Sequence, residues 1–318
     1  MDANTQALDA PKEYISSLPS KNVRAMLLAA LNVWFHLPAA MLAGLTEVVN
    51  QLHNASLILD DIQDQSPLRR GQAATHMVFG VGQSINTATF MIVETFQKVD
   101  LLVRGQAQEI MHTGLKSLFT GQSWDLDWKG RNYCPTREQY LEMVAGKTGA
   151  LFQLISRLMF CLAGSGSAIL PANPHPQEEQ ESLVETFDRF MNELGLYFQV
   201  RDDYRNLKDT SYTAQKGFCE DLDEGKFSYP VVMCCEINYL FKRPLLELFG
   251  RLKYRKGGME FEDKMKVLAM LDKSGAMKAT EVAIKAWEDK LMEMVTDLEK
   301  AFGSTNPALR EILMKLAA

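Results

Sequence analysis

Two acidic clusters with the same internal spacing are the residues of this chain best suited to chemistry. The first is Asp60-Asp61-Ile62-Gln63-Asp64, and the second is Asp202-Asp203-Tyr204-Arg205-Asn206. On a helix, positions i, i+1 and i+4 fall within about 100° of one another, so each cluster offers several oxygen ligands on one side. Mg²⁺ is commonly bound by a few carboxylates together with phosphate oxygens of a substrate. The spacing therefore predicts a site that holds a diphosphate on magnesium.

The residues that precede each cluster favour this interpretation over a solvated helix face. A single acidic cluster of this kind, taken alone, is explained equally well by solvation. Here Leu57-Ile58-Leu59 precede the first cluster, and the apolar residues of 196–200 precede the second. A buried carboxylate without a partner costs on the order of several kcal/mol. We therefore expect cationic partners or metal ions beside both clusters.

Candidate partners occur close to the first cluster and near the N-terminus. Arg69 and Arg70 follow the first cluster, and adjacent guanidinium groups suit two different phosphates because each binds phosphate oxygens bidentately. Lys21 and Arg24 lie on the first turn of a predicted helix, where the helix dipole also favours an anion. A solvated N-terminal turn explains this second pair equally well when it is considered alone.

His53 is a further candidate because it lies two turns before Asp60 on the same predicted helix. A single histidine is more often a structural residue with satisfied hydrogen bonds. Lysines later in the chain complete a basic set around the acidic clusters. They are Lys147, which is followed by Thr148, then Lys216 and Lys226.

Composition narrows the class of protein and its compartment. With 318 residues, of which 47% are hydrophobic and 23% charged, the chain can bury a large core. The net charge of −6 argues against a nucleic-acid partner, because proteins that bind nucleic acids carry basic surfaces. The five cysteines show no C-x-x-C spacing, which is typical of reduced intracellular thiols. With no secretory leader and no apolar run of about 18 residues, we expect a cytoplasmic protein without a membrane span.

The spacing of apolar residues predicts an all-α fold in one domain over residues 1–318, without repeats or βαβ units. Helices are predicted over 23–35, 38–63 and 181–208, and one or two over 83–119, the second ending at Gly121. Another helix follows Thr136, which is placed as an N-cap with Gln139 at the third helical position. Loops are predicted over 165–180 and 216–230, and Gly257-Gly258 separates the C-terminal helices.

Seven ordered segments of the chain together carry a resemblance to a known family. They are residues 18–24 (LPSKNVR), 52–64 (LHNASLILDDIQD), 67–71 (PLRRG), 121–128 (GQSWDLDW), 147–149 (KTG), 198–204 (FQVRDDY) and 216–226 (KGFCEDLDEGK). The chain resembles the all-trans isoprenyl (polyprenyl) diphosphate synthases over nearly its whole length. The closest resemblance is to fungal geranylgeranyl diphosphate synthases and to the prenyltransferase domains of fungal bifunctional terpene synthases.

The resemblance implies a fold, a reaction and partners. The fold would be an isoprenoid-synthase helical bundle around a central cavity, with two aspartate-rich helices facing each other. The reaction would be the Mg²⁺-dependent condensation of isopentenyl diphosphate with dimethylallyl, geranyl or farnesyl diphosphate. Several Mg²⁺ ions, but no protein general base, would take part, since the released diphosphate accepts the proton. The family also implies a homodimer or higher homo-oligomer, and leaves open a free enzyme or a domain fused to a terpene cyclase.

The roles implied for individual residues fall into three sets. Metal ligands would be Asp60, Asp64 and Asp202, with Asp61, Asp203 and Asn206 supporting them or binding through water. Residues for the allylic diphosphate would be Arg69, Lys147, Thr148, Gln199, Lys216 and Lys226, while Gln122 would line the bond-forming region together with Thr148. Residues for isopentenyl diphosphate would be Lys21, Arg24, His53 and Arg70. Asn206 departs from the family, where many relatives carry Asp, and Asp209 offers a compensating carboxylate.

The length of the product depends in this family on side chains that close the path of the growing tail. Ala55 and Ser56 are small and leave the path open, and of the three aligned positions deeper down, Ile92, Val93 and Phe119, only Phe119 is large. The resemblance therefore implies a C20 product or a longer C25 or C30 chain. Neighbouring side chains offer an alternative closure at C20, namely Phe90, Met91 and Phe96.

The acidic and basic residues also distinguish the chain from two other classes of protein. A class I terpene cyclase normally carries N/D-D-x-x-S/T-x-x-x-E as its second metal motif, which residues 202–209 do not match. A cyclase also needs no second diphosphate site. A non-catalytic partner subunit would be expected to have lost part of the acidic or basic set, and both sets are present here.

Overall fold

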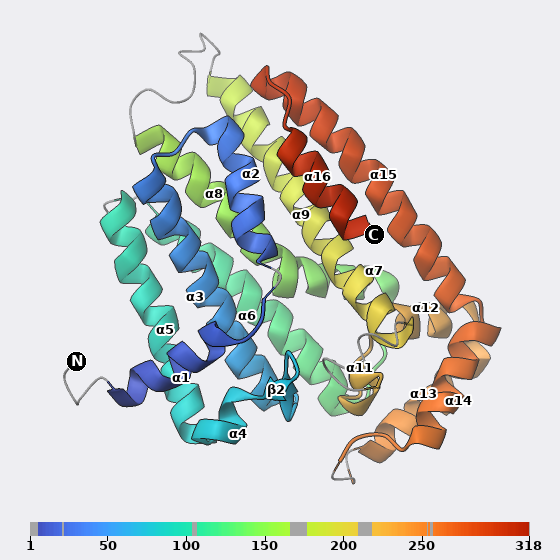
Figure 1. The fold of residues 1–318 in the computed structure, drawn as a ribbon. Helices are drawn as coiled ribbons and strands as arrows, with labels where there is room; N and C mark the ends of the chain where they lie inside the picture. The colour runs from blue at the N-terminus through green and yellow to red at the C-terminus, as the bar shows by residue number, and fades with distance from the viewer. Residues whose placement is uncertain are drawn as a thin grey trace. The chain divides into compact units, whose positions relative to one another are not determined.

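The computed structural model describes residues 6–20, 22–103, 107–165, 177–208, 218–252, 254 and 257–317. Apart from one short hairpin, the regular elements within these ranges are helices (Figure 1), which confirms the all-α prediction. The chain divides into two compact units, one made of Met1–Lys116, Leu151–Asn192 and Lys290–Ala318, the other of Ser117–Ala150 and Glu193–Asp289. The single domain over 1–318 and the facing of the two acidic helices stay predictions.

The first unit is built around α3 (Ala39–Gln63) and α5 (Val81–Val103), which pack side by side (Figure 1). Both helices contact α1 (Gln6–Ser17) and α4 (Thr75–Phe79), and α2 (Val23–Phe35) packs on α3 and on α16 (Pro307–Ala317). Three longer helices contribute part of their length to this unit. They are α6 (Gln108–Arg131), α9 (Gln177–Lys208) and α15 (Ala276–Phe302). Nearly all of α8 (Ala150–Ser165) also belongs to this unit.

Two apolar clusters hold the first unit together. One joins α1, α3 and α5 through Ile15, Ala55, Ile58 and Met91, with Ile92 packed against it. The other is aromatic, and its rings meet edge to face or stacked. Its members are Trp34, Phe35, Phe160, Phe187 and Phe302.

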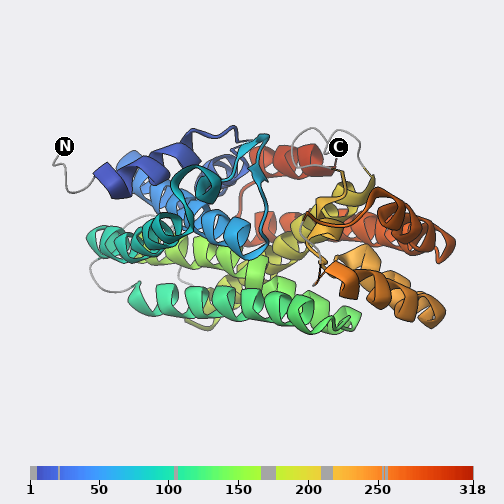
Figure 2. The ribbon, with the colours of Figure 1, turned by 90° about the horizontal axis from the view of Figure 1, so that it is seen from below.

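The second unit consists of shorter helices packed on one continuous apolar cluster. In chain order they are α7 (Arg137–Val144), a single π-helical turn η1 (Ala145–Gly149), α11 (Glu220–Asp223), α12 (Tyr229–Ile237), α13 (Tyr239–Leu252) and α14 (Phe261–Lys273). The helices α12, α13 and α14 pack on one another, and Figure 2 shows α13 and α14 side by side. The C-terminal parts of α6 and α9 and the start of α15 also belong to this unit.

Most of the predicted helices are observed, with differences at some ends. The predicted helix over 23–35 is α2, and Pro38 is the N-cap of α3. The Thr136 capping box is confirmed, since Thr136 accepts from the Gln139 backbone and the Gln139 side chain accepts in return. The predicted start of α9 is wrong by four residues, because the helix begins at Gln177. The predicted loop 216–230 contains α11 and gives way to α12 at Tyr229.

The prediction that a helix ends at Gly121 is wrong, because α6 continues through it to Arg131. Gly121 is buried where α6 crosses η1, and a Cβ there would lie 2.2 Å from the Lys147 backbone nitrogen. Gly146 on η1 faces it, since a Cβ on Gly146 would lie 3.2 Å from Gly121 Cα. The glycine therefore allows a close backbone approach instead of ending a helix.

Within the described residues, no helix is both long enough and apolar enough to cross a membrane.

Replacing Gly121 with Ala is expected to destabilise the protein by about 1–3 kcal/mol, because the new methyl group meets backbone atoms that cannot turn aside. Gly130 on the same helix is the matched control, since nothing lies within 4 Å of its Cβ position. Gly130→Ala should be neutral or slightly stabilising because alanine favours the helix. Urea unfolding of both variants measures the difference, and equal midpoints would contradict the close approach.

Candidate active site

A short β-hairpin with a two-residue turn positions the basic residues that follow the first acidic cluster. Strands β1 (Leu68–Arg69) and β2 (Gln72–Ala73) pair with Arg69 opposite Gln72, which leaves Arg70 and Gly71 as the turn. Both turn residues have positive φ, 56° for Arg70 and 78° for Gly71, as the tightest hairpins require. A left-handed conformation is unfavourable for arginine, so the hairpin holds Arg70 in place at some energetic cost. This hairpin was not predicted from the sequence.

Arg69 folds back onto the carboxylates at the end of α3. Its Nε donates to Asp61 Oδ1 at 2.7 Å, a second nitrogen binds the same oxygen, and Asp60 Oδ2 lies 3.7 Å away. Asp61 is fully buried, and burial raises its pKa although Arg69 opposes the shift. The other oxygen, Asp61 Oδ2, is buried and has no hydrogen-bond partner among the described residues. The Asp61–Arg69 pair therefore fixes the hairpin against the first acidic cluster.

A cationic cluster lies beside this pair, made of Arg24 on α2, His53 on α3, and Arg69 and Arg70 on the hairpin. Burial, and then the nearby charges of Arg24, Arg70 and Arg69, lower the pKa of His53 well below its usual value. At neutral pH His53 is therefore uncharged. Burial and the charge of Arg70 lower the pKa of Arg24 to about 10.

Two arginines of the cationic cluster have few acceptors among the described residues. Arg24 Nε is buried without a hydrogen-bond partner in this part of the chain. Arg70 donates to the Leu18 carbonyl at a long 3.4 Å. Buried donors of one charge sign stabilise an anion that can reach several of them. The structure thus brings three of the four residues predicted for isopentenyl diphosphate into one cluster, while Lys21 lies outside the described residues.

The second acidic cluster, on α9 in the other unit, is organised around Asp203. This fully buried carboxylate accepts four hydrogen bonds. Their donors are Gln199 Nε2 at 2.9 Å and Lys226 Nζ at 2.8 Å on Oδ1, with the Tyr140 hydroxyl at 2.5 Å and the Tyr229 backbone nitrogen at 2.8 Å on Oδ2. With both oxygens occupied, Asp203 fits the supporting role, and the neighbouring half-buried Asp202 remains the ligand candidate.

Lys226 is held between two carboxylates. Its Nζ lies 2.8 Å from Asp203 Oδ1 and 3.3 Å from Asp221 Oδ2. Burial opposes its charge, yet Asp203 and Asp221 together raise the pKa of Lys226 well above its usual value. Asn206 Oδ1 accepts from the Asp221 backbone nitrogen at 3.2 Å, so this amide supports the turn that carries Asp221. Asp209, the proposed substitute for a carboxylate at that position, lies outside the described residues.

The π-helical turn η1 presents the Lys147-Thr148 pair. Lys147 Nζ donates to Asp125 Oδ2 at 2.7 Å, and Thr148 donates to Gln199 Oε1 at 2.8 Å. Through Gln199, Thr148 is linked to Asp203. Burial works against the charge of Asp125, but Lys147 and Lys129 overcome it and hold the pKa of that carboxyl at about 2. π-helical turns of this kind are frequent at functional sites because they re-aim side chains.

Sequence reasoning missed the partners of these residues. Asp125, Tyr140 and Asp221 were not assigned any role, although Asp125 and Asp221 lie inside the quoted motifs. Asp125 and Tyr140 are far along the chain from their partners Lys147 and Asp203, and no local spacing indicates these pairs. Asp221 lies five residues before its partner Lys226. Lys216, predicted to bind the allylic diphosphate, lies outside the described residues.

The residues predicted to set product length lie in different surroundings. Ala55 and Ile92 belong to the apolar cluster of α1, α3 and α5, and half-buried Ser56 donates to the His53 carbonyl. Val93 is 58% exposed, in contrast to its neighbour Ile92. Phe119 belongs to the second unit and is 46% exposed.

Magnesium fits the donor chemistry of the acidic residues. Asp60, Asp64 and Asp202 are half-buried carboxylates, the hard oxygen ligands that Mg²⁺ prefers. No preformed group of three or more metal-ligating side chains occurs among the residues that the structure describes. Mg²⁺ usually binds through one or two carboxylates and substrate phosphates, so such a group is not required for this ion.

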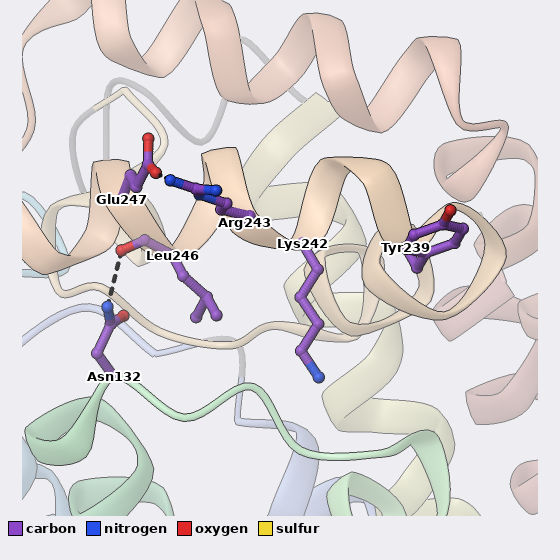
Figure 3. Close-up of a pocket in the computed structure, with 6 residues that line it drawn as sticks. All are labelled: Asn132, Tyr239, Lys242, Arg243, Leu246 and Glu247. Carbon is purple, nitrogen blue, oxygen red and sulfur yellow. Dashed lines mark hydrogen bonds and ion pairs between the residues drawn. The ribbon is translucent and has the colours of Figure 1, made fainter.

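A cavity of about 460 Å³ lies on the second unit away from these residues. Figure 3 shows its lining, which comes from α13 and from Asn132: Tyr239, Lys242, Arg243, Leu246 and Glu247. Asn132 donates to the Leu246 carbonyl and Arg243 pairs with Glu247. None of the predicted site residues lines this cavity.

The chain is similar to proteins of one known family. Residues 5–259 match the polyprenyl synthetase family. The chain is 43% identical to preterpestacin I synthase tpcA of Cochliobolus heterostrophus and 42% identical to bifunctional terpene synthase FUP1 of Fusarium proliferatum, over 98% of its own length in both cases. It is 41% identical to bifunctional sesterterpene synthase astC of Talaromyces wortmannii over 99% of its length. The chain spans only 42%, 40% and 40% of these three relatives, respectively.

The chain therefore belongs to the polyprenyl synthetase family, as its motifs predicted. Family membership places it among prenyltransferases and confirms the predicted all-α class of fold.

Asp125→Asn is expected to lower the free energy of unfolding by about 2 kcal/mol at neutral pH. The pKa of about 2 in the folded protein is below the ordinary carboxyl value of 3.8, so the carboxylate stabilises the fold above about pH 4. This contribution is lost as pH falls through about 2. Urea unfolding from pH 7 down to pH 3 should show the gap between wild type and variant shrinking below about pH 4.

Asp127→Asn is the matched control for this experiment, because Asp127 pairs with Arg131 on the exposed face of the same helix. Surface pairs of this kind contribute about 0–1 kcal/mol. Equal unfolding midpoints for the two variants would show that the buried Lys147–Asp125 pair does not stabilise the fold.

Proposed function

We propose that this chain condenses isopentenyl diphosphate with an allylic diphosphate, head to tail, to give an all-trans polyprenyl diphosphate. The observation that carries the proposal is the cationic cluster of Arg24, Arg69, Arg70 and neutral His53, whose buried Arg24 Nε has no partner among the described residues. It adjoins Asp60 of the first acidic cluster. A cation cluster next to carboxylates suits a diphosphate and the metal ions that accompany it.

The two groups of residues divide the work of the reaction. The cationic cluster, through Arg24, His53 and Arg70, would bind and orient isopentenyl diphosphate. The allylic diphosphate would be bound by Arg69, Lys147, Thr148, Gln199, Lys216 and Lys226. Magnesium, bound with the help of Asp60, Asp64 and Asp202, supplies charge stabilisation for the departing diphosphate.

The protein side chains contribute charge and position, not a general base. Lys226 stays protonated beside its carboxylates, and Lys147 pairs with Asp125. Both side chains can stabilise the negative charge that develops as the allylic carbon–oxygen bond breaks. The double bond of isopentenyl diphosphate then attacks the allylic carbon, and one proton leaves to the released diphosphate. His53, with its lowered pKa, donates or accepts a hydrogen bond as a neutral imidazole.

A product of 20 or 25 carbons is proposed, with C30 as the upper bound. The small side chains of Ala55 and Ser56 support a long product, and the relative astC is named a sesterterpene synthase, a class with 25 carbons. Relatives named bifunctional support a second proposal, that a fused cyclase consumes the product in a longer protein. The resemblance also supports a homodimer or higher oligomer, which light scattering would measure.

The direct test incubates the chain with Mg²⁺, labelled isopentenyl diphosphate and dimethylallyl, geranyl or farnesyl diphosphate in turn. After dephosphorylation, chromatography is expected to reveal a C20 or C25 alcohol. Asp60→Ala should reduce turnover roughly a thousandfold or more, because the developing negative charge loses its metal ligand. Asp127→Ala, on an exposed helix face, is the control and should keep wild-type turnover. Normal activity in Asp60→Ala would refute the metal assignment.

Product length should respond to Ile92 but not to Val93. Ile92→Tyr adds bulk next to Ala55 within the apolar cluster of the first unit and is expected to shorten the longest product. Val93 is 58% exposed, so the ring introduced by Val93→Phe should lie at the surface and leave the product unchanged. The same chromatographic assay compares the two variants. A shorter product from Val93→Phe alone would mean that this exposed side chain faces the tail.

A further inference from the structure

The turn of residues 218–226, called here the Lys226 turn, has local backbone bonds, such as Lys226 N to the Asp221 carbonyl at 2.9 Å, but it also contains residues in unfavourable conformations. It contains the short helix α11 and has two residues with positive φ, 51° at Cys219 and 66° at Gly225. A left-handed cysteine is an unfavourable conformation that surrounding contacts must maintain. The turn nevertheless places Lys226 and Asp221 against the Asp203 carboxylate.

Lys264 on α14 provides the main contacts that hold the Lys226 turn. Its ammonium donates to the Phe218 carbonyl at 2.6 Å and to Asp223 Oδ2 at 2.5 Å, so one cation joins the start and the middle of the turn. The residue is 7% exposed, which makes it one of the few buried lysines of the chain. A buried ammonium with two acceptors holds them strongly, because leaving it unpaired would cost several times the energy of an ordinary hydrogen bond.

The segment before α14 completes this arrangement. Asp223 Oδ1 accepts from the Met259 backbone nitrogen at 2.8 Å. Gly258, with φ of 81°, allows this approach, since a Cβ there would lie 2.4 Å from Asp223 Oδ1. Both oxygens of Asp223 are therefore engaged by residues on or just before α14.

From this arrangement we infer that Lys264 is a positioning residue for Lys226, acting through Asp223 and the Phe218 carbonyl. Lys264 makes no hydrogen bond or ion pair with Lys226 or Asp203 within the described residues, so its effect must pass through the backbone of the turn. Without the Lys264 bonds, the turn relaxes and the Lys226 ammonium is no longer fixed 2.8 Å from Asp203 Oδ1. The inference rests on the proposed function, in which Lys226 binds the allylic diphosphate.

Lys264→Met tests the inference, because methionine keeps the length and apolar character of the side chain but removes the ammonium. The KM for the allylic diphosphate should rise about tenfold, while the KM for isopentenyl diphosphate stays within about twofold of wild type. A purely structural loss would lower the active fraction, and with it kcat, and leave both KM values unchanged. Lys266→Met is the matched control, since Lys266 lies on the same helix and pairs with Asp263 at the surface.

Two further variants keep the test decisive if Lys264→Met folds poorly. Lys264→Arg retains the charge and donors and should recover most of the allylic KM. Gly258→Ala leaves every charge in place but pushes Asp223 aside, so it should raise the allylic KM in the same direction.

The outcomes separate this inference from the proposed function. A wild-type chain that does not elongate any allylic diphosphate would refute the proposed function itself. An active wild type with the same allylic KM in Lys264→Met, Gly258→Ala and the Lys266→Met control would refute the positioning role alone.

Discussion

Asp203 is a fully buried carboxylate that receives hydrogen bonds on both oxygens, and meeting this demand constrains the packing of the second unit. Its four donors come from separate parts of the chain. Tyr140 lies on α7, and Gln199 lies on α9 one turn before Asp203. Lys226 ends the turn that contains α11, and Tyr229 begins α12. These elements can satisfy the carboxylate only if all are placed correctly together, so the position of the second acidic cluster is tied to the packing of the unit.

The first unit instead brings like charges together. Arg24, Arg69 and Arg70 lie close to one another, and burial together with these charges lowers the pKa values of Arg24, His53 and Arg70. Asp61 binds Arg69 directly and also acts electrostatically on Arg70, and His53 stays neutral. Grouping like charges in this way costs stability. The second unit instead surrounds its buried carboxylate with donors from several elements.

Sequence patterns predicted the elements that follow local rules. The helix over 23–35 and the Thr136 cap depend on residues within a few positions of one another, and both are observed. Gly121 misled the prediction because its role depends on a backbone more than twenty residues away. The acidic and basic candidates could be recognised from residue type. Their pairing could not, since Asp125 with Lys147 and Asp203 with Lys226 are brought together by tertiary packing.

The π-helical turn at Ala145–Gly149 also fixes the alignment between two stretches of helix. A turn of this type accommodates one residue more than an α-helical turn, so each residue beyond it is rotated by about 100° relative to an uninterrupted helix. Deleting a single residue between 145 and 149 would cancel this offset, so α8 would keep its orientation while the turn itself became a regular helix. The extra residue therefore serves the direction in which Lys147 and Thr148 reach Asp125 and Gln199, and not the packing of α8.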